Sequence, residues 1–423
     1  MSRFKLCTFP NGLRLLLVPS HEATSFQISV LVNTGSDFEN QSNNGISHFL
    51  EHLCFKGTKK RPTNFDLTKE LDEVGGSYNA FTSEEATGYF AKVAAADQVL
   101  ALDLVSDIYL NSQFPLLEIE KERGVIIEEI NLFHDLPQNH VWDLWNKLLY
   151  GNQPAARPIL GTKENVKKFQ REDLIRYRNS QYRAASTLIV ASGKFQPLCL
   201  KREVKDAFSG ILRGKASKKN KTKERQNKPQ VILEKRKTEQ THLILGVRSF
   251  SLFDKRRYAL DVLDAILDGG MSGILFQTVR DKLGAAYYVQ SVTSFNTDRG
   301  FWVVKAGITN ERVEEIIKVI LKEWQKFKFQ PISLLDLKKA KHYLKGKVSL
   351  SLENVHDLAS DLAYQELLKK QIETPQEYLA KINQVSVRDV QLVAQSLLQP
   401  QRLNLALIGP FSNKNIFNKI LSF

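Results

Sequence analysis

The stretch of residues 214–229 constrains the fold more than any other part of the sequence. It is polar and rich in lysine, with scarcely any apolar residue to bury, which is typical of a linker or a long exposed loop. It divides the 423 residues almost in half, and each half is long enough to enclose a hydrophobic core. We therefore predict an N-terminal domain over residues 1–212, a basic linker over 213–230 and a C-terminal domain over 231–423.

The two halves end in a similar way. Residues 186–195 and residues 403–411 each read as an apolar strand that runs into a Gly-x-Phe sequence. Similarity at such a long spacing, between segments of nearly equal length, suggests a duplicated domain.

Each half mixes strand and helix patterns without regular alternation, which predicts an α+β fold of two structurally similar α/β sandwich domains, each a mixed sheet with helices. In the first half we expect strands at 27–33, 78–81 and 88–93 and helices at 45–55, 67–74, 95–110, 116–133 and 141–149. In the second half we expect a strand at 241–247, helices at 255–267 and 272–282, a strand opening at Tyr287 and helices over much of 311–398.

The net charge of +14 is concentrated in one place. Residues 213–237 carry eleven Lys or Arg residues against two Glu, so most of the excess is local to the linker. A nucleic-acid-binding patch is the alternative to a solvated linker. The segment lacks the interleaved aromatic residues of a single-strand binder, and we do not expect nucleic acid as a partner.

The location of the protein follows from what the sequence lacks. No stretch approaches the roughly 20 apolar residues of a transmembrane helix, and the N-terminal sequence resembles neither a secretory signal nor a transit peptide. The three cysteines, Cys7, Cys54 and Cys199, form no close pair, which favours a reducing compartment. We predict a cytoplasmic protein without a membrane span.

The segment with the clearest chemistry contains His48, Glu51 and His52, in the pattern His-x-x-Glu-His. On a helix, positions i and i+4 lie on one face, so the two imidazoles can converge on one metal ion. Glu51 shares that face and is placed to act as a general base on a water molecule. Paired histidines on an exposed amphipathic helix would be the structural alternative.

A zinc site of this kind needs a third protein ligand and one open position. The predicted helix at 116–133 carries several candidates: Glu118, Glu120, Glu122, Glu128 and Glu129. Glu122 and Glu129 are seven residues apart, two turns along one face, so Glu129 could reach the metal while Glu122 supports the ligands around it. Two imidazoles and one carboxylate suit Zn²⁺, and we expect one ion per chain.

His-x-x-Glu-His is the inverted zinc motif of the inverzincins. The surrounding sequence resembles the pitrilysin/insulinase-type zinc metallopeptidases, in the branch of the mitochondrial processing peptidase β subunit and its bacterial relatives. The similar segments are residues 11–13, 45–58, 75–82, 122–129, 157–161, 182–183 and 275–287. Seventy-six residues separate His52 from Glu129, which agrees with the family spacing and selects Glu129 over Glu128. Cys54 and Gly273 depart from residues common in the family, Met and Arg.

The resemblance implies a metalloendopeptidase that hydrolyses unfolded peptides, with Arg280 and Tyr287 as substrate-binding residues. It also implies a homodimer, because the family encloses its active chamber with four related domains. The segment 77–82 resembles the family's edge strand, which can pair with an extended peptide, and we select Asn79 and Ala80 as substrate contacts. Ordinary sheet packing is the alternative for this strand. A catalytically inactive structural or partner subunit of the same fold is the alternative for the whole protein.

Overall fold

The computed structural model describes residues 4–421, which group into two compact units. The first unit contains Met1–Leu132, Arg157–Asn220 and Ser351–Ile372. The second contains Phe133–Ala156, Lys221–Leu350 and Glu373–Phe423. The two units therefore exchange short segments across the predicted sequence boundary, and each is described separately below.

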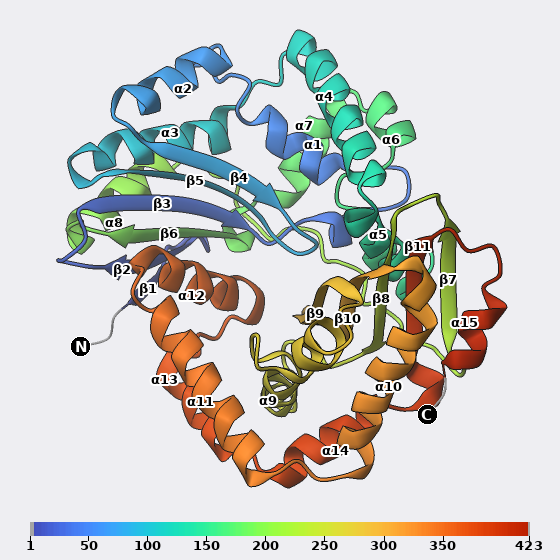
Figure 1. The fold of residues 1–423 in the computed structure, drawn as a ribbon. Helices are drawn as coiled ribbons and strands as arrows, with labels where there is room; N and C mark the ends of the chain where they lie inside the picture. Colours follow the sequence, from blue (N-terminus) through green and yellow to red (C-terminus); the bar gives the residue numbers. More distant parts are fainter. Residues whose placement is uncertain (1–3, 422–423) are drawn as a thin grey trace. The chain divides into compact units, whose positions relative to one another are not determined.

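The first unit is built around a six-stranded sheet with the order β1-β2-β6-β3-β5-β4 (Figure 1). Its strands are β1 Lys5–Thr8, β2 Arg14–Pro19, β3 Ser25–Val32, β4 Ser77–Thr82, β5 Thr87–Ala94 and β6 Thr187–Gly193. Strands β2 and β6 are parallel, and all other neighbours are antiparallel. Strand β4 lies at the edge, where it pairs only with β5 among the described strands.

Side chains alternate along these strands and fill a core on each face of the sheet. Val30 and Val32 on β3 pack into the larger core with helices on one face, whereas Leu31 between them packs into a smaller core on the other. Helix α3, Gln98–Asn111, lies against the first face and helix α12, Val355–Lys369, against the second (Figure 1). The remaining helices of this unit are α1 Ile46–Leu53, α2 Asn64–Glu73, most of α4 Leu116–Asp135, α6 Lys163–Lys168, α7 Arg171–Gln181 and α8 Pro197–Ala207.

The second unit repeats this design with a five-stranded sheet in the order β7-β11-β8-β10-β9. Its strands are β7 Gln230–Lys235, β8 Gln240–Arg248, β9 Ala286–Phe295, β10 Gly300–Thr309 and β11 Asn404–Gly409. The parallel pair β7/β11 and the antiparallel steps to β8, β10 and β9 match the sequence of directions from β2 to β4 in the first sheet. The two Gly-x-Phe segments follow β6 and β11, which hold equivalent places, as expected for a duplicated fold.

One face of the second sheet packs against α9, Arg257–Asp268, α10, Val313–Phe329, and α14, Val387–Leu397. The other face packs against α5, Pro137–Tyr150, whose Trp145 is fully buried beside Ile244 and Val303. Further helical segments of this unit are the π-helical turn η5 Phe276–Asp281, α11 Leu334–Ser351, α13 Pro375–Gln384 and α15 Asn415–Ile420. Thus α5 covers a sheet of the second unit and α12 a sheet of the first, although each lies in the opposite half of the sequence.

The predicted fold class, α+β with two similar sandwich domains, is confirmed. Most of the expected strands and helices are present, with small differences at their ends. The helix expected at 272–282 differs, because its main part is a π-helical turn at Phe276–Asp281. A 3₁₀ turn, Ala95–Asp97, precedes α3, and β9 starts at Ala286, one residue before Tyr287. Residues 214–229 contain no helix or strand. Lys219 in this segment is nevertheless only 13% exposed, because its ammonium lies 2.5 Å from Glu85 and 3.2 Å from Asp37. Within residues 4–421, no helix is both long and apolar enough to cross a bilayer.

Candidate metal centre

Helix α1 carries the His-x-x-Glu-His pattern, and a buried carboxylate fixes its start. Gly45 precedes the helix with a φ of 98° and has no side chain with which to cap it. Glu39 takes this role, accepting the Gly45 and Ser47 backbone N–H groups at 2.8 Å each and the Asn44 amide at 2.9 Å. Burial raises the pKa of Glu39, although each of these hydrogen bonds acts to lower it.

Gly45 and Gly161 allow the segment 157–161 to pass close to the start of α1. A Cβ at Gly161 would lie 2.5 Å from the Gly45 Cα, so no larger residue fits there without movement of the backbone. Arg157 donates to the Glu39 carbonyl oxygen at 2.5 Å. The segment 157–161 therefore holds the loop before α1 in place.

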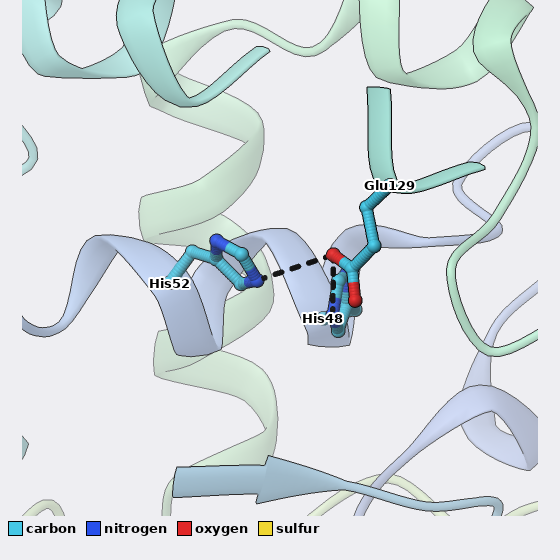
Figure 2. A group of neighbouring side chains, drawn as sticks. All are labelled: His48, His52 and Glu129. Atoms are coloured by element: carbon cyan, nitrogen blue, oxygen red, sulfur yellow. Dashed lines mark ion pairs between the residues drawn. The ribbon is translucent and has the colours of Figure 1, made fainter. Parts of the chain in front are cut away.

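The two histidines and Glu129 converge at one point, as Figure 2 shows. The Nε2 atoms of His48 and His52 each lie 3.6 Å from the same Glu129 oxygen, Oε2. The two ring centroids are 4.6 Å apart. Helix α1 supplies both imidazoles and helix α4 supplies the carboxylate. The structure thus brings together the three residues that the sequence selected as metal ligands.

Burial and nearby charges shift the pKa values of the two imidazoles in opposite directions. Burial, together with the neighbouring His52, lowers the pKa of His48 to about 3, so His48 is neutral at physiological pH. Burial also acts to lower the pKa of His52, but its hydrogen bond to Glu122 and the nearby Glu51 and Glu129 charges outweigh burial and raise it. Both imidazoles keep Nε2 directed toward Glu129.

Glu122, which lies two turns before Glu129 on α4, contacts the Nδ1 side of His52. Its Oε2 lies 3.0 Å from His52 Nδ1, and its Oε1 pairs with the Lys56 ammonium at 2.7 Å. Although burial acts to raise the pKa of Glu122, the His52 and Lys56 contacts outweigh it and lower the pKa. An ionised carboxylate at Nδ1 leaves Nε2 as the free lone pair of a neutral His52, which is the tautomer a metal requires.

Glu51 points to the edge strand of the sheet. Its Oε2 accepts a hydrogen bond of 2.8 Å from the Thr82 hydroxyl at the end of β4. Burial raises the pKa of Glu51, and the Thr82 hydrogen bond partly opposes this rise. A carboxylate with a raised pKa suits proton transfer near neutral pH.

The three donors fit a zinc ion. Ligand atoms at tetrahedral zinc are about 3.4 Å apart, given metal–ligand distances of about 2.1 Å. The 3.6 Å separations between each Nε2 and Glu129 Oε2 need only a small movement to reach that geometry. Two imidazoles and one carboxylate are also the donors that zinc accepts in catalytic sites.

Asn79 and Ala80 lie on β4, whose far side is not paired with any described strand. Asn79 is exposed, and its side-chain oxygen accepts the Ala80 backbone N–H at 2.8 Å. The Asn79 side chain therefore engages the Ala80 N–H in this structure.

Arg280 and Tyr287 lie in the second unit, at η5 and at the start of β9. Both are exposed, Tyr287 by 76%, and the Arg280 guanidinium packs over the Phe276 ring at 5.3 Å. Neither side chain is fixed by burial, so both are accessible to a ligand.

Sequence reasoning missed three residues that shape this centre: Glu39, Lys56 and Thr82. None has a spacing pattern of its own, since each acts through a contact made by folding. Cys54, which follows α1, is buried at 1% exposure, and its thiol contacts the Tyr89 hydroxyl at 3.4 Å.

Solved structures share this fold. A protease from Helicobacter pylori matches with a TM-score of 0.90 and 23% sequence identity, covering 97% of this chain and 100% of the other. A peptidase M16 inactive domain from Pseudomonas fluorescens matches with a TM-score of 0.89 and 16% identity, over 97% of this chain and 98% of the other. The molecule therefore has the two-domain α+β fold of these proteins.

Sequence comparison gives the family. Residues 14–163 match Insulinase (Peptidase family M16), and residues 168–344 match the peptidase M16 inactive domain. A Bacillus subtilis protein named as an uncharacterized zinc protease is 34% identical over 409 residues, which cover 97% of this chain and 99% of that protein. A Streptomyces coelicolor protein with the same description is also 34% identical, over 96% of this chain and 90% of the other. The chain belongs to peptidase family M16, which confirms the resemblance to the insulinase-type peptidases.

Proposed function

We propose that this protein is a zinc metalloendopeptidase that hydrolyses unfolded peptides or short extended segments of polypeptide. The convergence of His48 Nε2, His52 Nε2 and Glu129 Oε2 carries the proposal. These three residues hold one zinc ion per chain, and Glu122 orients His52. Relatives named as zinc proteases, at 34% identity over nearly the whole chain, support this assignment.

Zinc in this site supplies Lewis acidity, which activates water and polarises the scissile carbonyl at neutral pH. Glu51 takes the proton from the attacking water and passes it to the leaving amine. The Thr82 hydroxyl holds the Glu51 carboxylate by its Oε2. Arg280 and Tyr287 bind the substrate, where a guanidinium and a phenol can donate hydrogen bonds to peptide carbonyls.

The substrate adds to β4 as an extended strand, in contact with Asn79 and Ala80. This mode of binding uses main-chain hydrogen bonds, so it tolerates many sequences but requires an unfolded segment. We expect cleavage of a denatured protein and no cleavage of the same protein in its folded form.

The decisive experiment compares the wild type with Glu51→Gln, Glu129→Gln and Glu128→Gln in a peptide-cleavage assay with metal analysis. Glu51→Gln should keep zinc and lose at least about 100-fold in kcat, because only the proton acceptor is removed. Glu129→Gln should lose zinc and activity together. The matched control Glu128→Gln should change neither, since Glu128 is exposed on the same helix and contacts Asn131.

Equal rates for the wild type and Glu51→Gln would reject Glu51 as the base. Absence of turnover in the wild type, with the stability unaffected by Glu51→Gln, would instead support an inactive structural subunit of the same fold.

The proposal includes a homodimer and a cytoplasmic location. The free cysteines, two of them buried, support a reducing compartment. Sedimentation of the active enzyme tests the dimer, and a monomer that cleaves peptides would exclude it. Cell fractionation tests the location.

A further inference from the structure

A second cluster in the described structure has the same donor set as the candidate catalytic centre. His134, His140 and Glu234 each offer one ligand atom, and these atoms lie within 4.8 Å of one another in the second unit. His134 comes from the last turn of α4, His140 from the first turns of α5, and Glu234 from β7, against which α5 packs. The two ring centroids are 4.3 Å apart, close to the 4.6 Å between His48 and His52.

The central member of this cluster is His140. Its side chain is 13% exposed, and its Nε2 lies 2.9 Å from Glu234 Oε2. Its other nitrogen, Nδ1, faces Asp143 Oδ2 at 3.5 Å, one turn further along α5. His52 has the same arrangement, with one nitrogen toward a shared carboxylate and the other toward a supporting carboxylate. A carboxylate behind a histidine orients the ring and increases its basicity toward a metal.

Arg236 contacts the other two members of the cluster, Glu234 and His134. Its guanidinium donates to Glu234 Oε1 at 2.5 Å and 3.0 Å, which leaves Oε2 directed at His140. It also donates to the His134 carbonyl oxygen at 2.7 Å and lies 3.4 Å from His134 Nε2. These contacts preorganise His134 and Glu234. The positive charge also repels a cation, so an ion should bind here more weakly than at the first centre.

We propose that His134, His140 and Glu234 form a second metal site that binds a divalent transition-metal ion of the zinc type. Two imidazoles and one carboxylate select zinc and its transition-metal neighbours over Mg²⁺ and Ca²⁺, which prefer all-oxygen sites. The site joins the end of α4, the start of α5 and strand β7. Its role is to cross-link these three elements, and it does not depend on the peptidase activity proposed above.

The test is zinc binding to the full-length protein, by titration calorimetry and by metal analysis after equilibrium dialysis. The wild type should bind a second zinc ion per chain, with an affinity at least about tenfold lower than the first. His140→Ala and Glu234→Gln should each lose only the weaker ion. A double variant, His48→Ala with His52→Ala, should lose only the tighter one, so failure of either site is distinguished from failure of the other.

Three further variants control for misfolding and for non-specific binding of zinc. His134→Asn changes a side chain that is 54% exposed, so it should fold normally and still weaken the second ion. His342→Ala, an exposed histidine of α11 in the same unit, should leave both ions bound. Arg236→Gln should tighten the second ion by about tenfold, because it removes the repelling charge while the glutamine amide can still donate a hydrogen bond to Glu234.

Saturation of the wild type by a single zinc ion would overturn the proposal, as would a second ion unaffected by His140→Ala, Glu234→Gln and His134→Asn. The cluster would then be an ion-pair network alone.

Discussion

Glu39 offers a quantitative test of how the fold stabilises the start of helix α1, which carries His48 and His52. The perturbation is Glu39→Ala, which removes the acceptor for three donors at the start of α1: the Gly45 and Ser47 backbone N–H groups and the Asn44 amide. A buried donor left without a partner costs about 1–3 kcal/mol, and loss of a helix N-cap costs about 0.5–2 kcal/mol. Relief of the burial of the carboxylate itself offsets part of this. We expect a loss of about 3 kcal/mol in the unfolding free energy of the first unit.

The assay is urea unfolding followed by circular dichroism and fitted with two transitions, because a chain of two units need not unfold in one step. Asp66→Ala is the matched control. Asp66 also accepts a backbone N–H at a helix start, from Thr63 at 2.9 Å. This hydrogen bond is exposed and Asp66 is only partly buried, so water can replace the carboxylate and the effect should be much smaller. Equal effects of Glu39→Ala and Asp66→Ala would refute the argument from burial.

The pH dependence of a Glu39→Gln variant sharpens the test. Burial raises the pKa of Glu39, so the folded state holds this proton more tightly than the unfolded state. The contribution of Glu39 is therefore complete below its ordinary pKa of 4.5 and declines as the pH rises. Glutamine keeps one acceptor oxygen and cannot ionise, so the advantage of the wild type over Glu39→Gln should shrink with rising pH. An advantage that grows instead would show that the charge itself caps the helix.

Three other predictions follow from single contacts. Thr82→Val should lower kcat about tenfold with little change in KM, because Glu51 loses the hydrogen-bond donor at 2.8 Å. Thr82→Ser should restore the rate, and a fully active Thr82→Val would exclude this positioning role. Lys219→Met should lower the unfolding free energy of the first unit by about 3 kcal/mol in urea, because Lys219 pairs with two buried carboxylates. Substitution of the exposed Lys218 by Met should have no effect, and equal effects would contradict the role of this ion pair. Burial raises the pKa of Asp261 from 3.8 to about 6, so the folded state loses stability as the pH rises through this window. Asp261→Asn should therefore raise the unfolding free energy by up to about 3 kcal/mol at pH 7.5 and leave it unchanged near pH 4. A gain in stability that is independent of pH would refute the assignment.

The sequence by itself determined the local structure and two pairs of side chains that share a helix face, 48 with 52 and 122 with 129. Helices and strands follow from apolar periodicity, which reports the face that each element buries. Positions 48 and 52 share a helix face by geometry alone, as do Glu122 and Glu129. Helical geometry could not choose between Glu128 and Glu129 as the ligand, and only the family spacing made that choice.

Only the tertiary structure decided which sheet each helix covers. The apolar face of α5 is readable from the sequence, but nothing in it shows that the face packs on β11 of the second unit, or that α12 packs on β6 of the first. The domains at 1–212 and 231–423 stay a prediction from the sequence, while the compact units exchange these two helices. An amphipathic pattern gives the side of a helix that is buried and carries no information about its partner.

The same limit explains the missed polar residues and the second cluster. Glu39 caps α1, Thr82 holds Glu51, and Lys219 pairs with buried acids, in each case across a turn or a long separation in sequence. His140 and Glu234 meet although 94 positions separate them. Hydrogen bonds and ion pairs depend on where folding places two side chains, so a pattern within one segment determines its helix or strand, and tertiary packing determines its chemistry.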